Sequence, residues 1–308
     1  MIEIKTVKIH ALLTAASPIT HMKGTSGNEA IINRESVLHN GEVVEVPMLS
    51  GNAIRHNMVR EPGAYHLIEK CRLVGKLNIE QANFMFNGGS LIASSTTDNL
   101  KKIADMQELL PLYHLLGGCL SNQIIGGSLL CGRGVLVCEE NREVLDKILP
   151  NSIRLPENAL RGCEDFVSGW QYTRSDANKR TDLISETDGD SNLMIYNGQH
   201  IIPGAVFYIG FILQNINRLE LGAIFNAFKR WKDSGGIIGG QSRIGHGKFD
   251  IELFIEESTN FFGDEIDTEA YSEEYSKHVE NNSAKITDWL NNTFPSKTAK
   301  VTKTKEAV

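Results

Sequence analysis

The chain has 308 residues, of which 41% are hydrophobic and 22% charged, and a formal net charge of −7 at pH 7. These are ordinary globular values, and the sequence has no run of eighteen apolar residues, which excludes a typical membrane span. The five cysteines are odd in number and form no CxxC pair. They predict free thiols in a cytoplasmic protein rather than a disulfide framework or a zinc site.

The charge is distributed unevenly along the chain. Residues 251–295 contain eleven acidic and two basic residues, whereas 296–308 contain four lysines and one glutamate. The first 250 residues are therefore almost neutral, with 25 basic and 26 acidic residues. This distribution argues against indiscriminate binding of phosphate through bulk charge, but it leaves room for a local basic groove.

The N-terminal part predicts a strand, a hairpin and a helix. Apolar residues alternate over 7–13, which indicates a half-buried strand. Residues 35–46 form a hairpin candidate that turns at Asn40–Gly41. Ser50 is a suitable N-cap for a helix, which Pro62–Gly63 is expected to interrupt.

The middle of the chain is harder to divide into elements. Residues 64–130 are predicted to be mostly helical, and residues 134–140 to form a strand. The polar stretch 164–203 predicts a projecting ribbon or loop. Breaks in the helical stretch are expected at Gly88–Gly89, Pro111, Gly117–Gly118 and Gly126–Gly127.

The C-terminal third predicts a strand, a helix, a glycine-rich loop and a second strand. The first strand spans 204–215, and Asn217 caps the helix with Glu220 three residues further on. The loop 235–248 leads into the strand 248–254. With the N-terminal strand and helix, this order predicts an α+β fold of ferredoxin-like type with a large insertion.

The glycine-rich loop has six glycines within residues 235–247. It is no Walker loop, because Phe249 follows Gly247–Lys248, and no Rossmann fingerprint, because it follows a helix and opens a strand. A tight turn between a helix and a sheet remains one interpretation. A loop whose amides approach an anionic backbone is favoured by the residues among the glycines, which include Ser242, Arg243, His246 and Lys248.

The loop, with serine and arginine between glycines, resembles the signature of the RAMP superfamily of CRISPR proteins. Three further stretches, in the same order as in that superfamily, strengthen the resemblance to its backbone subunits, the Cas-seven family: 47–60 (PMLSGNAIRHNMVR), 170–182 leading to 200–213, and 218–231. Residues 109–129 look most like the type IV backbone subunit, with type I-D second.

The resemblance implies an RRM-like palm, a helical finger region and a thumb β-ribbon. It implies copies that stack along a CRISPR guide RNA, leave its bases free to pair with target DNA or RNA, and associate with other effector subunits, a helicase among the candidates. No cofactor, metal or membrane is expected. The implied parts are the palm at 1–70 and 130–257, the finger insertion at 71–129, the thumb at 165–203, an acidic extension at 258–295 and a disordered tail at 296–308.

A protein that binds guide RNAs of any sequence must contact their phosphates and sugars. The candidates are a helix N-terminus, basic side chains, an aromatic ring and the glycine-rich loop. Each has a structural alternative: solvated helix residues for Arg55 and Arg60, and hinge packing for Trp170. The expected RNA-binding residues are Ser50, Gly51, Asn52, Arg55, His56, Arg60, Trp170, Arg174, Lys179, Arg180, Gly239, Gly240, Gln241, Ser242, Arg243, His246 and Lys248.

Cleavage is the competing function. Type III relatives cut target RNA with an aspartate in the loop after the first strand, but residues 21–46 contain no aspartate here, and Asn33 lies near the expected place. Asparagine is no general base and a poor substitute for a metal-binding carboxylate. We therefore expect no catalytic residues. The alternative is a RAMP endoribonuclease that cuts target RNA through Glu29 or Glu35, or processes guide precursors through His21.

Overall fold

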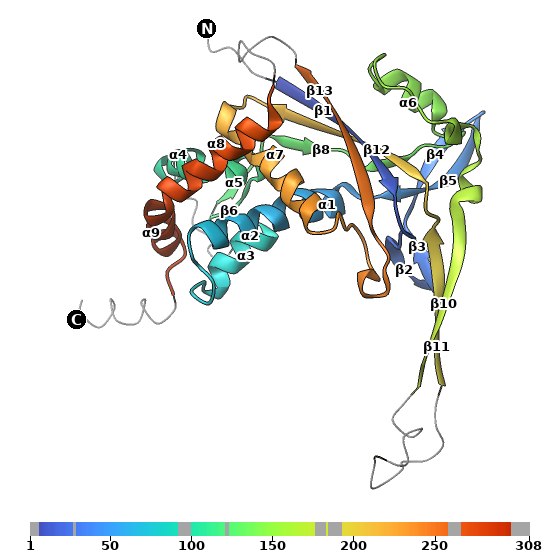
Figure 1. Ribbon diagram of the computed structural model, residues 1–308, viewed down its shortest axis with the longest axis horizontal. Coiled ribbons are helices and arrows are strands. Elements are labelled where there is room, and N and C mark those ends of the chain that lie inside the picture. The colour runs from blue at the N-terminus through green and yellow to red at the C-terminus, as the bar shows by residue number, and fades with distance from the viewer. Residues whose placement is uncertain are drawn as a thin grey trace.

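The computed structural model describes residues 6–26, 29–91, 100–120, 123–175, 183, 193–257 and 266–296. The fold is α+β, as the sequence predicted. A sheet lies at the centre, most of the helices pack against one of its faces, and a long two-stranded ribbon extends away from it (Figure 1). No helix in this described part is long and apolar enough to cross a membrane.

The central sheet has seven strands. Their order is β13-β1-β12-β9-β5-β4, and β8 also pairs with β12. In this sheet β1 lies antiparallel to both β12 and β13, so that His10 is opposite Gly210 on one side and Phe254 on the other. The strands are β1 (Thr6–Ala15), β4 (Arg34–His39), β5 (Glu42–Leu49), β8 (Leu129–Cys131), β9 (Gly134–Leu136), β12 (Val206–Gln214) and β13 (Phe249–Glu257).

Alternation along β1 divides the core in two. Val7, Ile9 and Leu13 belong to the large core that the helices cover, whereas Leu12 belongs to a smaller core on the opposite face. On β13, the outer strand of the sheet, most side chains that face the same way as Leu12 are acidic. They are Asp250, Glu252 and Glu256.

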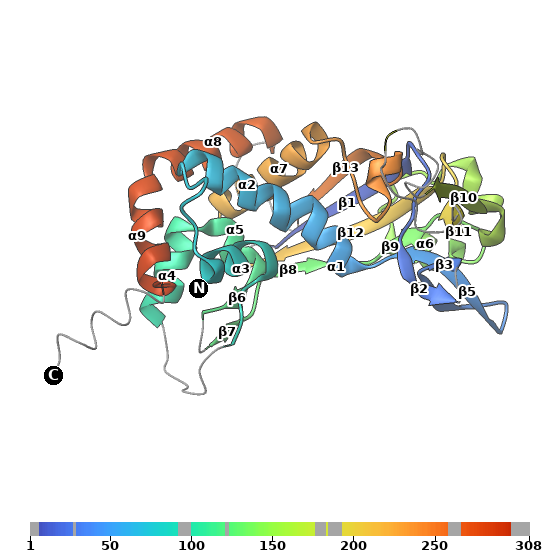
Figure 2. The same cartoon turned by 90° about the horizontal axis from the view of Figure 1, so that it is seen from below.

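All of the described α-helices except α6 cover the large-core face of the sheet, and they extend beyond its end (Figure 2). Helix α6 packs on the smaller core through Leu145. The longest uninterrupted α-helix of the described residues is α7, whose N-cap Asn217 and Glu220 form the predicted capping box. Gly222 lets α8 pack closely on α7, because a Cβ at this position would lie 2.2 Å from the carbonyl oxygen of Tyr271. The helices are α1 (Gly51–Ile54), α2 (Glu61–Lys70), α3 (Ile79–Asn87), α4 (Leu100–Leu109), α5 (Pro111–Leu116), α6 (Arg142–Ile148), α7 (Arg218–Asp233), α8 (Thr268–Asn281) and α9 (Ser283–Thr293).

Pro62–Gly63 does not interrupt the helix that begins after Ser50, so that prediction was wrong. The helix runs from α1 through a π-helical turn, η1 (Arg55–Arg60), into α2. Pro62 lies in the first turn of α2, where the wider turn before it accommodates the missing N–H. Gly63 is a packing glycine, because a Cβ there would lie 1.9 Å from Cδ2 of Leu112.

The stretch 64–130 is only partly helical. Helices α2 to α5 alternate with turns, and the two-stranded β6 (Gly118–Cys119) and β7 (Ile124–Ile125) follow α5. The strand predicted over 134–140 is shorter than expected, because β9 ends at Leu136. Short 3₁₀ turns complete this half of the chain: η2 (Glu157–Leu160) and η3 (Cys163–Phe166).

The polar stretch after residue 164 forms the projecting ribbon. Its strands β10 (Val167–Ser175) and β11 (Leu193–Ile201) are antiparallel, with Tyr172 opposite Tyr196. At its base β11 pairs with β3 (Glu29–Ile32), which pairs with β2 (Met22–Ser26). The ribbon is thus part of a second, four-stranded sheet.

Candidate nucleic-acid interface

The glycine-rich loop is bound to the segment that follows β1. The amide of Gly240 donates to the carbonyl of Thr20 (2.7 Å), that of Gly247 to Pro18 (2.8 Å) and that of Lys248 to Oγ of Ser17 (2.9 Å). These three amides hold the loop in place and are not free to bind an anion. For this part of the loop, these bonds fit the tight-turn interpretation.

Close backbone packing explains two of the loop glycines. A Cβ at Gly239 would lie 2.7 Å from the carbonyl oxygen of Thr20, and one at Gly247 would lie 2.8 Å from that of Ile238. Both also have positive φ angles, 101° and 92°. A side chain at either position would push the loop away from its neighbour.

Free amides lie at the tip of the loop. Gln241 has a left-handed backbone (φ 61°) and precedes the 3₁₀ turn η5 (Ser242–Ile244). Within the described chain, the N–H groups of Gln241, Ser242 and Arg243 make no hydrogen bond, and both Ser242 and Arg243 are exposed. Successive free amides in such a turn form an anion-binding nest, so this candidate site is the tip of the loop and not its glycines.

His246 is a structural residue of this loop. Its side chain is buried, and Nδ1 lies 2.7 Å from Oγ1 of Thr20. Burial lowers the pKa of His246, and burial together with His246 lowers that of His200, whose ring lies 5.8 Å away. Both rings are therefore neutral at pH 7, which argues against His246 as a phosphate partner.

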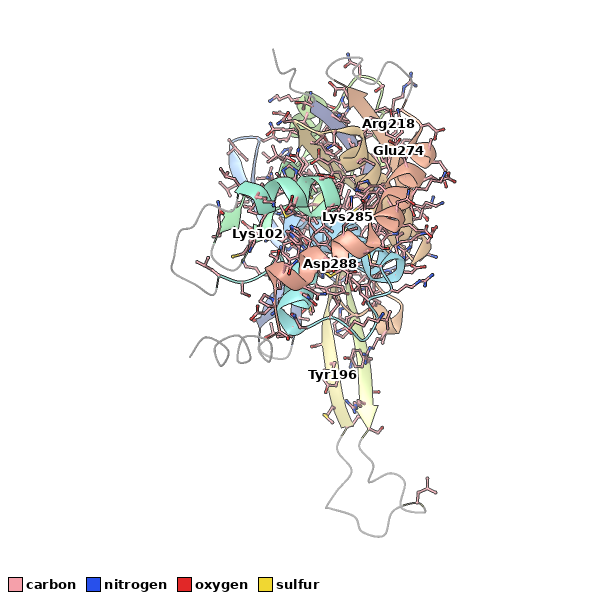
Figure 3. All side chains as sticks on the ribbon, turned by 90° about the vertical axis from the view of Figure 1, so that its left-hand side faces the viewer. Lys102, Tyr196, Arg218, Glu274, Lys285 and Asp288 are labelled. Atoms are coloured by element: carbon pink, nitrogen blue, oxygen red, sulfur yellow. The ribbon has the colours of Figure 1, made fainter. Side chains whose placement is uncertain are left out.

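A row of rings joins the loop to the ribbon. Trp170 lies edge-on to His246 (6.3 Å between centroids) and stacks on Tyr172 (5.4 Å), which stacks on Tyr196 (5.0 Å). The indole of Trp170 donates to the carbonyl of Gln199 (3.1 Å). Trp170 thus packs at the hinge, and the exposed end of the row is Tyr196, which lies on the ribbon in Figure 3.

The helix that begins after Ser50 starts beside the same segment. The amide of Ser50 donates to Nε2 of His21 (3.0 Å), and Oγ of Ser50 accepts from the amide of Ala53 (3.3 Å), as an N-cap does. Thr20 holds the glycine-rich loop and its neighbour His21 holds the helix start. Residues 20–21 therefore link the start of this helix to the glycine-rich loop.

Arg55 and Arg60 are not solvated helix residues, which was the structural alternative. Arg60 is only 8% exposed, and it donates to the carbonyls of Phe84 (3.3 Å) and Gly117 (3.2 Å). Arg55 is partly buried and donates to the carbonyl of Leu116. Burial lowers the pKa of both guanidinium groups, and the charge of Arg55 lowers that of Arg60 further.

The remaining predicted basic residues are not gathered at this site. His56 faces Glu61 on its own helix (3.6 Å), and Arg174 is exposed far along the ribbon. Lys179 and Arg180 lie outside the described residues. Arg243 and Lys248 both lie exposed on the glycine-rich loop.

Of the side chains proposed for cleavage, Glu35 and His21 are occupied by contacts within the protein, whereas Glu29 has no such contact among the described residues. Glu35 forms an ion pair with Arg133, and the amide of Asn33 packs against Sδ of Met48 (3.1 Å). Nε2 of His21 accepts from Ser50, and burial lowers the pKa of His21. Glu29 lies on β3, next to the ribbon. In the part of the chain that is described, no three His, Cys, Asp or Glu residues are grouped as a metal site would require.

Sequence reasoning missed the residues that organise the site. Thr20 accepts from Gly240 and contacts His246, yet nothing local marks it, because its role depends on contacts more than 200 positions away. Three Gly–Gly pairs outside the loop, at 88–89, 117–118 and 126–127, were predicted only as helix breaks. The structure places residues of all three pairs in one recess, which Arg60 also lines.

No family model matches the sequence, and no curated protein matches it. Solved structures do match the fold. A chain of the type IV-B CRISPR complex is 16% identical, with a TM-score of 0.52 over 85% of this chain and 96% of that one. Csc2 of Thermofilum pendens is 14% identical, with a TM-score of 0.40 over 94% and 81%. The chain thus shares its fold with a protein of the type IV-B CRISPR complex, in agreement with the resemblance seen in the sequence.

Proposed function

We propose that the protein is a non-catalytic backbone subunit of a type IV-like CRISPR effector complex. In this proposal copies bind side by side along a guide RNA and leave its bases free to pair with target nucleic acid. The observation that carries the proposal is a fold shared with a chain of the type IV-B complex, and three features that could bind phosphates support it. These features are the amides of Gln241–Arg243, the helix start at Ser50, and the two arginines Arg55, which is partly buried, and Arg60, which is buried.

The strand order supports an RRM-like palm. Taken in chain order, β1, β9, β12 and β13 stand in the sheet as β13-β1-β12-β9. The helix that starts after Ser50 comes between the first two of these strands, and α7 comes between the last two. This is the β-α-β-β-α-β order of a ferredoxin-like unit, with the finger residues inserted after its first helix.

The interface suits a guide of any sequence. Backbone amides and guanidinium groups bind phosphates and do not distinguish bases. Specificity would come from pairing between the guide and its target, as in other RNA-guided systems. The nearly neutral first 250 residues fit a subunit that contacts only a few nucleotides.

The test is assembly on end-labelled RNA of guide length. Purified protein is mixed with the RNA, the particles are sized by mass, and the RNA is then treated with a nuclease. We expect multimers whose mass rises in whole protein units, a regularly protected footprint and intact RNA. Monomeric protein with unprotected RNA would overturn the proposal. RNA fragments made by the protein itself would replace it with the endoribonuclease alternative.

A further inference from the structure

The three Gly–Gly pairs of the finger region meet in space. A Cβ at Gly89 would lie 2.4 Å from the carbonyl oxygen of Cys119, and one at Gly117 would lie 2.4 Å from the amide nitrogen of Gly127. A Cβ at Gly118 would lie 2.8 Å from the carbonyl oxygen of Gly88. Backbone therefore packs on backbone at all three pairs, and the absence of side chains leaves space beside them.

That space is a recess of about 590 Å³, lined by five of these six glycines (all but Gly126), two arginines and several aliphatic side chains. Three of its lining side chains are well exposed although they are aliphatic: Leu91 (61%), Ile124 (74%) and Leu130 (49%). Arg55 and Arg60 also line it. The recess therefore combines an apolar wall with two positive charges.

The π-helical turn brings the two arginines to the recess together. In an α-helix, side chains five positions apart point about 140° away from each other. In η1 the amide of Glu61 donates to the carbonyl of His56, five residues earlier. In such a wider turn, two side chains that are five positions apart lie about one turn apart on roughly the same side of the helix. Arg55 and Arg60 are five positions apart. Turns of this kind are frequent at functional sites.

Among the residues that the structure describes, the pair has no anionic partner. Neither Arg55 nor Arg60 forms an ion pair with any described carboxylate. Arg60 has only two long hydrogen bonds to carbonyls, and Nε of Arg55 is buried without a hydrogen-bond partner. Arg60 is buried and Arg55 partly buried, and buried charges in folded proteins are normally paired. The arrangement fits a bound anion that supplies the missing charge.

We propose that this recess binds a single nucleotide, with its phosphate on Arg55 and Arg60 and its base against the aliphatic wall of Leu91, Ile124 and Leu130. A free phosphate would satisfy the arginines and leave the wall exposed to water, whereas a nucleotide covers both. The inference rests on the proposed function for the source of that nucleotide, one unit of a bound RNA strand.

The test uses RNA-free protein and three probes: uridine monophosphate, uridine and inorganic phosphate. Binding is measured by isothermal titration calorimetry. We expect the monophosphate to bind about tenfold more tightly than inorganic phosphate and uridine to bind most weakly, because only the monophosphate makes both contacts. Equal affinity for monophosphate and inorganic phosphate would overturn the proposal, as would no binding of the monophosphate.

Two variants locate the site. Arg60→Gln should weaken monophosphate and inorganic phosphate together, whereas Ile124→Ser should weaken only the monophosphate. Arg142→Gln, an exposed arginine on α6, is the control. Because Ile124 is exposed, its variant keeps the test valid if Arg60→Gln fails to fold. Unchanged binding of the monophosphate to Ile124→Ser would contradict the proposed position of the base against Ile124.

The outcome can be separated from that of the proposed function. Normal assembly on guide-length RNA without monophosphate binding would contradict the nucleotide site but not the proposed function. Monophosphate binding by a protein that never assembles on RNA would contradict the proposed function, because the nucleotide would then be a free ligand.

Discussion

The amide of Ser50 donates a hydrogen bond to Nε2 of His21, over 3.0 Å. This bond ties the start of the long helix to the segment that holds the glycine-rich loop through Thr20. An imidazole nitrogen that accepts from an amide carries no proton, so His21 is held in the neutral form that its lowered pKa favours. We therefore expect His21 to position the interface and to take no part in RNA cleavage.

His21→Ala should leave the amide of Ser50 without its partner. We expect the free energy of unfolding to fall by about 1–2 kcal/mol, the usual cost of such a loss. Urea unfolding measures it, and His39→Ala, on the outer hairpin, is the control. Wild-type protein should leave guide-length RNA uncut. Fragments that appear with wild type and vanish with His21→Ala would show that the imidazole is catalytic.

Arg243→Ala combined with Lys248→Ala should weaken RNA binding at the glycine-rich loop. If each side chain neutralises one phosphate, the slope of log affinity against log salt should become shallower by about 1.4. Fluorescence anisotropy over a salt series measures the slope. Lys229→Ala with Lys232→Ala, on α7, removes the same charge elsewhere and should leave the slope unchanged. An unaltered slope in the loop variant would remove the loop from the interface.

Gly198→Ala should disturb the base of the ribbon. Its Cβ would lie 2.8 Å from both Cβ and the carbonyl oxygen of Ala30, and 2.8 Å from Cζ2 of Trp170. We expect a loss of about 1–3 kcal/mol, as for other overpacked sites. Gly169→Ala is a matched control on the paired strand, since its nearest neighbour would be 3.8 Å away. Thermal unfolding compares the two, and equal melting temperatures would contradict the packing of the hinge.

Acid should destabilise the protein through His66. Its side chain is 1% exposed and stacks on Tyr275, and burial, helped by the nearby charges of Arg230 and Lys70, lowers its pKa to about 4. In the unfolded chain the imidazole of His66 binds a proton near pH 6.5, whereas in the folded chain it does so only near pH 4. Stability is therefore complete above about pH 6.5 and falls towards pH 4, by up to about 3 kcal/mol.

His66→Phe should remove much of this pH dependence, because phenylalanine keeps a ring against Tyr275 and cannot titrate. Melting temperatures at pH 7 and pH 4.5 measure the effect, with His39→Phe, at a half-buried histidine of the outer hairpin, as the control. A drop that is equally steep in His66→Phe and wild type would assign the acid sensitivity to other groups.

The sequence predicts well what local rules determine. The hairpin at Asn40–Gly41, the N-cap at Ser50 and the capping box of Asn217 and Glu220 are all present. Each depends on residues within four positions of one another. The α+β class follows from the order of such elements.

Long-range contacts decided what the sequence could not show. The helix passes Pro62 because a π-helical turn precedes it, and Gly63 makes room for Leu112. In the glycine-rich loop the amides of Gly240 and Gly247 are used by Thr20 and Pro18, which leaves the free amides at the tip. No spacing rule reveals which amides a distant segment will occupy.

The outer strand of the main sheet has a consequence for how copies meet. A strand at the border of a sheet offers unpaired backbone groups to any other chain, and charged side chains discourage such pairing. The outer strand β13 carries such charges at Asp250, Glu252 and Glu256. Two copies approaching through this border would repel each other, so uncontrolled aggregation in concentrated solution is disfavoured and growth of an ordered array would depend on a template.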